Sequence, residues 1–202
     1  MNDAGSGADA LRYEDMFIEE FVPSVEQAHG LGGRAERRAV AGLSMGGYGA
    51  LMYALRYPGR FGAAAGLSTA HFTDEGYRAM PMGEWNRFFG HAFARDLAGS
   101  ARLTDRAREY NLADIVRRTA PDRLRRTRYH LGCGTEDTNY LPGTEDLRSG
   151  SPDLHSTGWS HSRSTADGSP ASTACATPTS CTGPRRCSDS TEEATSHGNH
   201  DR

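Results

Sequence analysis

The chain has 202 residues, of which 36% are hydrophobic, and a formal net charge of −3 at pH 7. A charge this small argues against binding to nucleic acid or to a membrane surface, and no apolar run approaches the length of a transmembrane helix. Residues 1–10 lack the basic start and apolar stretch of a signal peptide, so we expect a cytoplasmic protein.

Composition divides the chain into three parts. Residues 1–10 are small and polar, and we expect them to be frayed, whereas residues 11–148 carry the regular large apolar side chains of a globular domain. Residues 149–202 have only Leu154 and Trp159 as large apolar residues and are rich in Ser, Thr, Gly and Pro. Such a segment buries too little apolar surface to offset its chain entropy, so we expect a disordered, low-complexity tail. The abruptness of the change is typical of translation out of frame.

The first half of the domain predicts a βαβ unit. Helical spacing of apolar residues predicts a helix over 13–30, in which Pro23 should cause a kink. The apolar run 38–43 predicts a short buried strand, residues 45–58 a helix, and residues 61–67 a second buried strand. Strand, helix and strand in this order predict an α/β fold with a parallel sheet flanked by helices.

The second half is less regular. Residues 71–127 contain helical patterns over 82–98 and 104–120, which we interpret as an insertion over the sheet edge, and residues 128–134 predict a third strand. Trp85, Phe88 and Phe89 fit either an aromatic pocket or a packed core, and their helical spacing favours the core.

A G-x-S-x-G motif occupies Gly42 to Gly46, between the first predicted strand and the helix that follows it. This motif is typical of a nucleophile elbow, in which a tight turn holds a serine, here Ser44, in a strained conformation with its hydroxyl exposed. We expect side chains at Gly42 or Gly46 to collide with the neighbouring strand and helix, and Gly47 and Gly49 to let the helix approach the sheet. The amide of Met45 would then face a substrate oxyanion at the positive end of the helix dipole.

Two segments carry a family resemblance: "YEDMFIEEFVPSVE" and "RRAVAGLSMGGYGALMYALRYPGRFGAAAGLS". They resemble the esterase family of α/β-hydrolases whose members include feruloyl and acetyl xylan esterases, S-formylglutathione hydrolases and mycolyltransferases. The resemblance is strong over residues 13–68 and fainter over 85–147. It implies an α/β-hydrolase-like fold, a small-molecule or carbohydrate ester as substrate, Ser44 as nucleophile and the Met45 amide as one oxyanion-hole donor, with no metal or organic cofactor.

A triad acid is expected after a later strand, because α/β-hydrolases order their triad as Ser, acid and His along the chain. Asp137 follows the third predicted strand in "GTED" and is our assignment, with Glu136 as the fallback. The other interpretation is that both are solvated loop acids that cap a helix.

The triad histidine is the least clear assignment. His155 and His161 come soon after the acid and lie in sequence without a predicted strand, while His197 and His200 come late. Within "GNHDR", His200 matches a local G-x-H pattern, and we assign it as the general base. His71, His91 and His130 precede the acid and would break the family order.

These residues predict a serine carboxylic-ester hydrolase that acts through an acyl-enzyme. Members of the resembled family begin with several strands and a Gly-rich loop that supplies a second oxyanion donor, and nothing before Tyr13 matches that loop, so we expect an incomplete sheet. Two alternatives remain open: a catalytically inactive remnant or binding module, and an acyltransferase that uses the same serine, as mycolyltransferases do. The sequence does not determine the oligomeric state.

Overall fold

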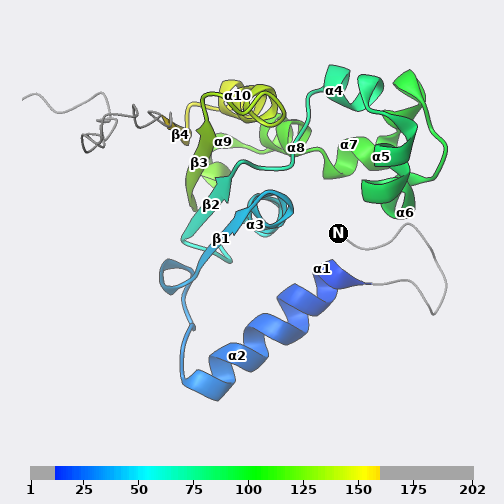
Figure 1. The fold of residues 1–202 in the computed structure, drawn as a ribbon. Coiled ribbons are helices and arrows are strands. Elements are labelled where there is room, and N and C mark those ends of the chain that lie inside the picture. Colours follow the sequence, from blue (N-terminus) through cyan, green and yellow to red (C-terminus); the bar gives the residue numbers. More distant parts are fainter. Residues whose placement is uncertain (1–11, 160–202) are drawn as a thin grey trace, which may run out of the picture. The chain divides into compact units, whose positions relative to one another are not determined.

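The structure is a computed structural model that describes residues 12–159, with the backbone alone for residues 155–159 (Figure 1). All of these residues belong to the first of two units, Met1–Ser172, and the second unit, Thr173–Arg202, lies outside the described residues. The predicted frayed start and most of the predicted tail therefore also lie outside them. In chain order the elements are α1 (Tyr13–Asp15), η1 (Met16–Phe21), α2 (Val22–His29), η2 (Ala35–Arg37), β1 (Ala39–Leu43), α3 (Met45–Arg56), β2 (Ala63–Leu67), α4 (Asp74–Ala79), α5 (Met82–Phe88), α6 (Gly90–Phe93), η3 (Gly99–Arg102), α7 (Asp105–Tyr110), α8 (Leu112–Arg118), α9 (Pro121–Leu124), β3 (Arg128–Gly134), α10 (Leu141–Gly150) and β4 (Leu154–Trp159).

The described strands form one parallel sheet in the order β1-β2-β3-β4. Leu43 at the end of β1 pairs with Leu67 of β2, and Leu67 pairs with Gly132 of β3. The carboxyl ends of the strands therefore meet at one edge of the sheet, which is where ligands bind in open α/β sheets. The predicted βαβ unit and the bounds of the third strand are confirmed.

Strand β4 corrects the prediction that the chain becomes disordered at Ser149. Residues Leu154–Trp159 pair in parallel with Tyr129 to Gly134 of β3. Composition misses this strand because backbone hydrogen bonds to an existing sheet edge require few apolar side chains. Leu154, which is 3% exposed, is the side chain that joins the hydrophobic core.

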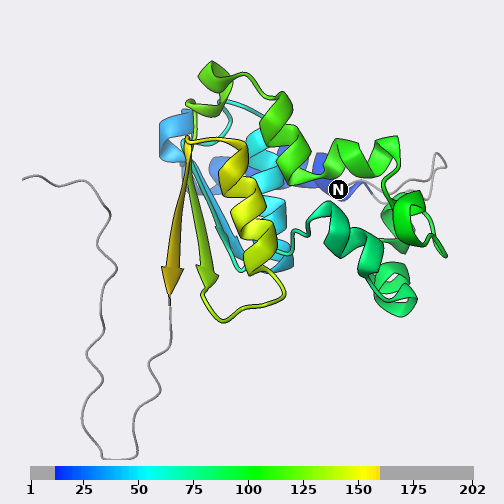
Figure 2. The ribbon, with the colours of Figure 1, turned by 90° about the horizontal axis from the view of Figure 1, so that it is seen from above.

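Helices α3, α8 and α10 cover one face of the sheet (Figures 1 and 2). Their apolar side chains pack with one face of the strands into a core that includes Leu51, Val116, Leu131 and Leu147. Strand β1 is the edge strand of the described sheet, and its residues alternate between exposed and half-buried. The prediction of a buried first strand is therefore wrong. Among the described residues, only β2 pairs with β1, and the other edge of β1 has no neighbouring strand.

The expected N-terminal helix is present as α1, η1 and α2. Pro23 lies inside this continuous helical run, directly after a π-helical turn, Met16–Phe21. Because proline has no N–H to donate to the preceding turn, one backbone hydrogen bond of the run is lost there. The helical run ends at Gly30, which adopts the left-handed conformation with φ 64°, as a helix stop requires.

Of the insertion predicted over residues 71–127, the helices from α4 to α7 extend away from the sheet (Figure 2), whereas α8 and α9 contribute to the main core, so the prediction is wrong for these two helices. The helices from α4 to α7 have a second aromatic core, which includes Tyr77, Trp85 and Phe89. Arg102 is 2% exposed and donates to the carbonyls of Leu97, Tyr77 and Met80, so it holds the insertion together from inside. None of the helices within residues 12–159 combines the length and the apolar character needed to cross a bilayer.

Candidate active site

Ser44 lies at a sharp turn between β1 and α3, as the motif predicts. Its backbone has φ 54° and ψ −117°, a combination that L-residues rarely adopt, and α3 begins at the next residue, Met45. Three backbone hydrogen bonds hold the turn: the Ser44 amide donates to the Leu67 carbonyl (2.9 Å), and the Ser44 carbonyl accepts from the amides of Tyr48 and Ala70 (both 3.0 Å). The serine is thus fixed at the strand end, half-buried, and outside the helix.

The glycines around Ser44 are not equivalent. A Cβ atom added to Gly42 would lie 2.2 Å from the backbone carbon and oxygen of Gly46, so Gly42 is required by the close approach of strand and helix. Gly47 also lies close to the sheet, although less tightly, since its Cβ would lie 3.0 Å from the Gly42 oxygen. The prediction was wrong for Gly46 and Gly49, because a Cβ there would meet open space or only the edge of the Tyr53 ring at 3.9 Å.

Asp137 lies after β3, at the same sheet edge as Ser44. Its Oδ1 accepts from the backbone amides of Asn139 (3.2 Å) and Tyr140 (3.1 Å), and the Cys133 thiol donates to Oδ2 over 3.7 Å. The two amides hold the carboxylate in place through Oδ1. Within the described residues, the only hydrogen-bond donor to Oδ2 is the weak Cys133 thiol. This arrangement fits a helix-start acid and equally an acid that orients a histidine, while Glu136 is exposed.

The base predicted from sequence, His200, lies outside the described residues, and so does His161. One of the two reasons for setting His155 and His161 aside, the absence of a strand, is wrong, because β4 spans Leu154–Trp159. His155 belongs to the strand itself and pairs with His130. His161 is the second residue in sequence after Trp159, the last residue of β4.

A pocket of about 510 Å³ opens at Ser44, within the range of small-molecule sites. None of its lining residues, all from the described part of the chain, is Asp, Glu, Lys or Arg. Half of them are phenylalanine or tyrosine, so the pocket suits an uncharged, ring-bearing group. The lining residues are Tyr13, Ser44, Met45, Tyr48, Gly49, Met52, Tyr53, Ala70, Phe72, Phe88, Phe89, His91, Ala92 and Tyr140.

The aromatic residues of the insertion divide between pocket and core. Phe88 and Phe89 line the pocket, and Phe89 also packs in the second core, whereas Trp85 is fully buried in that core. Helical spacing alone does not separate these roles, because it identifies the buried face but not what lies opposite to it. His91 of α6 also lines the pocket, although it precedes the acid in the chain.

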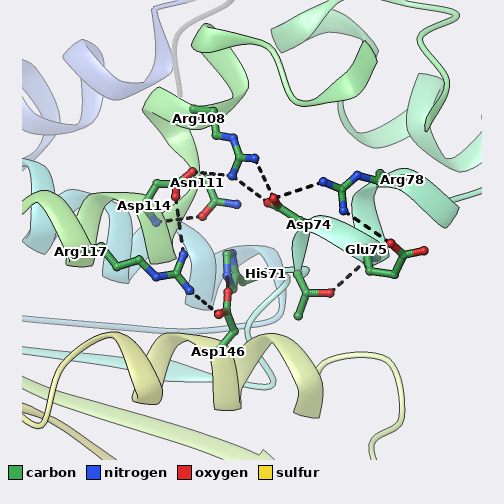
Figure 3. Close-up of polar contacts among 11 residues, drawn as sticks. His71, Asp74, Glu75, Arg78, Arg108, Asn111, Asp114, Arg117 and Asp146 are labelled. Atoms are coloured by element: carbon green, nitrogen blue, oxygen red, sulfur yellow. Dashed lines mark hydrogen bonds and ion pairs between the residues drawn. The ribbon is translucent and has the colours of Figure 1, made fainter. Parts of the chain in front are cut away.

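His71, which the order of the triad sets aside, is a buried histidine between the pocket-lining residues Ala70 and Phe72 in the sequence, and Figure 3 shows it facing Asp146. His71 is 0% exposed, and within the described residues neither of its ring nitrogens has a hydrogen-bond partner. Its Nε2 lies 3.6 Å from Oδ2 of Asp146, with Arg117 and Asp114 as the next charges. Burial lowers the pKa of His71 below its ordinary value, so the imidazole is neutral at pH 7.

Sequence patterns missed most of the pocket wall. Tyr13, Phe72 and Tyr140 come from three distant segments, and the tertiary fold alone brings them together. Two signals were available: Phe72 follows the predicted second strand at the carboxyl edge of the sheet, and Tyr140 follows the predicted acid.

Known proteins similar to this chain are esterases. A family model described as "Putative esterase" matches residues 1–148. Esterase MT1326 of Mycobacterium tuberculosis (strain CDC 1551 / Oshkosh) is 37% identical over 67 residues, which are 33% of this chain and 15% of that protein. Esterase Rv1288 of strain ATCC 25618 / H37Rv matches to the same extent.

Two solved structures resemble the described fold. A ferulic acid esterase has a TM-score of 0.56 at 24% identity, over 74% of this chain and 53% of that chain. FphF, a fluorophosphonate-binding serine hydrolase of Staphylococcus aureus, has a TM-score of 0.52 at 23% identity, over 71% of this chain and 53% of that chain. They share with this chain an α/β-hydrolase-like fold, and the chain spans about half the length of each.

Proposed function

Because the chain belongs to the Putative esterase family, we propose that it hydrolyses carboxylic esters through an acyl-enzyme on Ser44. The observation that carries this proposal is the strained serine turn, with φ 54° and ψ −117°, at the mouth of an aromatic pocket. Such strain persists only where the surrounding structure enforces it, and it is concentrated at functional sites. Here Gly42 and three backbone hydrogen bonds enforce it.

In the proposed reaction, Ser44 Oγ attacks the carbonyl carbon of the ester while a histidine takes the hydroxyl proton. The Met45 amide, in the first turn of the 12-residue helix α3, donates to the oxyanion, and the helix dipole adds a favourable potential. The histidine then gives the proton to the departing alcohol. Water, deprotonated by the same histidine, attacks the acyl-serine, and the histidine returns the proton to Ser44 Oγ as the acid is released.

The acid and base of this reaction are assigned from the topology of the sheet. Asp137 orients the histidine through Oδ2, because its Oδ1 is occupied by two backbone amides. For the base we propose His161 in place of His200. The parallel strand β4 ends at Trp159, at the sheet edge of Ser44 and Asp137, and His161 follows two positions later in the sequence.

The pocket selects the acyl group. A volume of about 510 Å³ with uncharged, ring-rich walls favours an aromatic or other bulky apolar acyl group over an anionic one. Phe88 and Phe89 of the insertion provide one wall, and Tyr48 and Tyr53 of α3 provide another.

The test compares release of p-nitrophenol from an acetyl and from an aromatic p-nitrophenyl ester by the full chain. We expect faster turnover of the aromatic ester, and a loss of about 10³-fold or more in the Ser44→Ala and His161→Ala variants. His200→Ala is the matched control and should retain activity within about threefold. If His200→Ala is inactive and His161→Ala is active, the assignment of the base is wrong.

Two further outcomes separate the alternatives. A folded parent protein that hydrolyses neither ester would contradict the proposal and support an inactive remnant. Acyl transfer would be revealed by a sugar ester as product when a carbohydrate acceptor is added, in place of the free acid.

A further inference from the structure

Residues 68–73, between β2 and α4, touch both the nucleophile turn and the pocket. The Ala70 amide donates to the Ser44 carbonyl (3.0 Å), and the Ser68 amide donates to the carbonyl of Gly132 (2.7 Å). Ala70 and Phe72 line the pocket, whereas His71 between them is fully buried away from it. The position of this segment therefore determines where part of the pocket wall lies.

Phe72 is the larger of the two side chains of this segment that line the pocket. Its ring centroid lies 5.7 Å from that of Tyr77 and 6.2 Å from that of Phe89, both from the insertion. On the other side it lies 5.7 Å from Tyr140, whose amide binds Asp137. Phe72 thus connects the insertion with the loop of the proposed acid.

The His71 end of the segment is held against α10. A Cβ atom on Gly143 would lie 1.9 Å from the His71 carbonyl oxygen, so the segment rests directly on the helix backbone. The imidazole faces Asp146 of the same helix at 3.6 Å. The carboxylate of Asp146 is in turn held by Arg117 of α8 at 2.5 Å.

A series of ion pairs leads from Arg117 to Asp74, the residue that directly follows the 68–73 segment (Figure 3). Arg117 lies 3.6 Å from Asp114, and Asp114 lies 3.0 Å from Arg108 of α7. Arg108 binds both carboxylate oxygens of Asp74 at 2.8 and 2.7 Å. We name this series of contacts the ion-pair chain: Asp146, Arg117, Asp114, Arg108 and Asp74 form its ion pairs, and the neutral imidazole of His71 ends it by contact with Asp146.

The ion-pair chain begins at His71 and ends at Asp74, so both of its ends lie on the same short stretch of backbone. Asp74 is the first residue of α4, three positions after His71, and Thr73 caps that helix by accepting from the Gly76 amide (3.1 Å). Phe72 therefore lies in the sequence between two residues, His71 and Asp74, that are each held by contacts with other helices. The Asp74 contact is a two-bond fork to a guanidinium, the stronger geometry for such a pair.

We propose that the ion-pair chain positions Phe72 and so sets the width of the acyl pocket, which makes His71 and Asp74 positioning residues for the ester substrate. The inference rests on the function proposed above, because it assigns the pocket to the acyl group. Breaking either end of the chain should let the 68–73 segment move while Ser44 and the sheet stay in place.

Hydrogen–deuterium exchange of the full chain tests the positioning role without reference to activity. Asp146→Asn and Asp74→Asn should each raise amide exchange in residues 68–73 about tenfold, with exchange in α3 and β3 unchanged. The double variant should raise exchange by less than the product of the single effects, because both changes break one connected series. Asp153→Asn is the matched control, since this acid pairs at 3.4 Å with Arg125 on the surface and lies outside the chain of contacts.

Ester kinetics test the link to specificity. The KM for an aromatic p-nitrophenyl ester should rise about tenfold in Asp146→Asn, while kcat changes less than about threefold and the KM for the acetyl ester stays constant. Asp146→Glu, which keeps the charge, should restore part of the lost affinity. A loss of folded protein would instead lower kcat equally for both esters.

The outcomes separate this inference from the proposed function. Unchanged exchange in residues 68–73, exchange that rises across the whole domain, or single effects that multiply in the double variant would each overturn the positioning role. If the parent protein hydrolyses neither ester, the proposed function fails, and the exchange data alone decide whether the ion-pair chain anchors the segment.

Discussion

Replacing Gly42 by alanine tests the geometry of the serine turn. The added Cβ would lie 2.2 Å from Gly46 backbone atoms, whereas ordinary contacts begin at 3.4 Å, so strand β1 and helix α3 would have to separate by about 1.2 Å. Overpacking of this kind costs about 1–3 kcal/mol, which corresponds to a decrease in Tm of about 2–12 °C for a domain of this size. A displacement of about 1 Å at the nucleophile lowers its reactivity about 100-fold.

The matched control is Gly46→Ala, at the other glycine of the same motif. A Cβ there meets nothing within 4 Å, and alanine in place of a helical glycine adds about 0.5–1 kcal/mol of stability. The assay measures thermal unfolding and the rate at which a fluorophosphonate labels Ser44. If Gly42→Ala unfolds at the parental temperature and labels at the parental rate, the described contact between strand and helix is wrong.

Other predictions concern buried polar groups and pH. Arg102→Ala should lower the free energy of unfolding by about 3 kcal/mol or more, because the carbonyls of Leu97, Tyr77, Arg78 and Met80 lose a charged donor; an unchanged urea midpoint would contradict this. Tyr48→Phe should lower the free energy of unfolding by about 1 kcal/mol, because it removes the 2.7 Å hydrogen bond from the Tyr48 hydroxyl to the backbone carbonyl of Tyr110. Because burial lowers the pKa of His71 below 6.5, the unfolded chain binds more protons, so stability should fall as pH drops below 6.5, and His71→Asn should flatten this slope in urea titrations. The lowered pKa of Asp146 adds a further loss only below pH 3.8, so a slope that His71→Asn leaves unchanged above pH 5 would refute the role of the imidazole.

Local sequence rules predicted the part of the fold whose signals are local. The βαβ unit and the strand Arg128–Gly134 follow from apolar runs between turn residues, and the Gly30 stop follows from helix-ending chemistry. Strand β4 was missed because its side chains are polar and its pairing is supplied by β3. The exposure of β1 was missed because a composition typical of a buried strand does not reveal how many neighbours it has.

Within the pocket, the sequence predicted best the residues that belong to the G-x-S-x-G motif. Gly42 approaches Gly46 within the motif itself, so this part of the turn was readable from the sequence, whereas the hydrogen bonds of Ser44 to Leu67 and Ala70 were not. Phe72 and Tyr140 reach the pocket from segments that the sequence separates widely, and His71 carries no motif at all. Such residues become visible only when tertiary packing defines a cavity and its anchors.

The measurement that tests the account most directly is covalent labelling of the folded full chain with a fluorophosphonate, followed by mapping of the modified residue by mass spectrometry. We predict one adduct per chain, on Ser44, and none in a folded Ser44→Ala variant. Absence of an adduct on the folded parent protein, or equal labelling of both proteins, would contradict the assignment of Ser44 as an activated nucleophile.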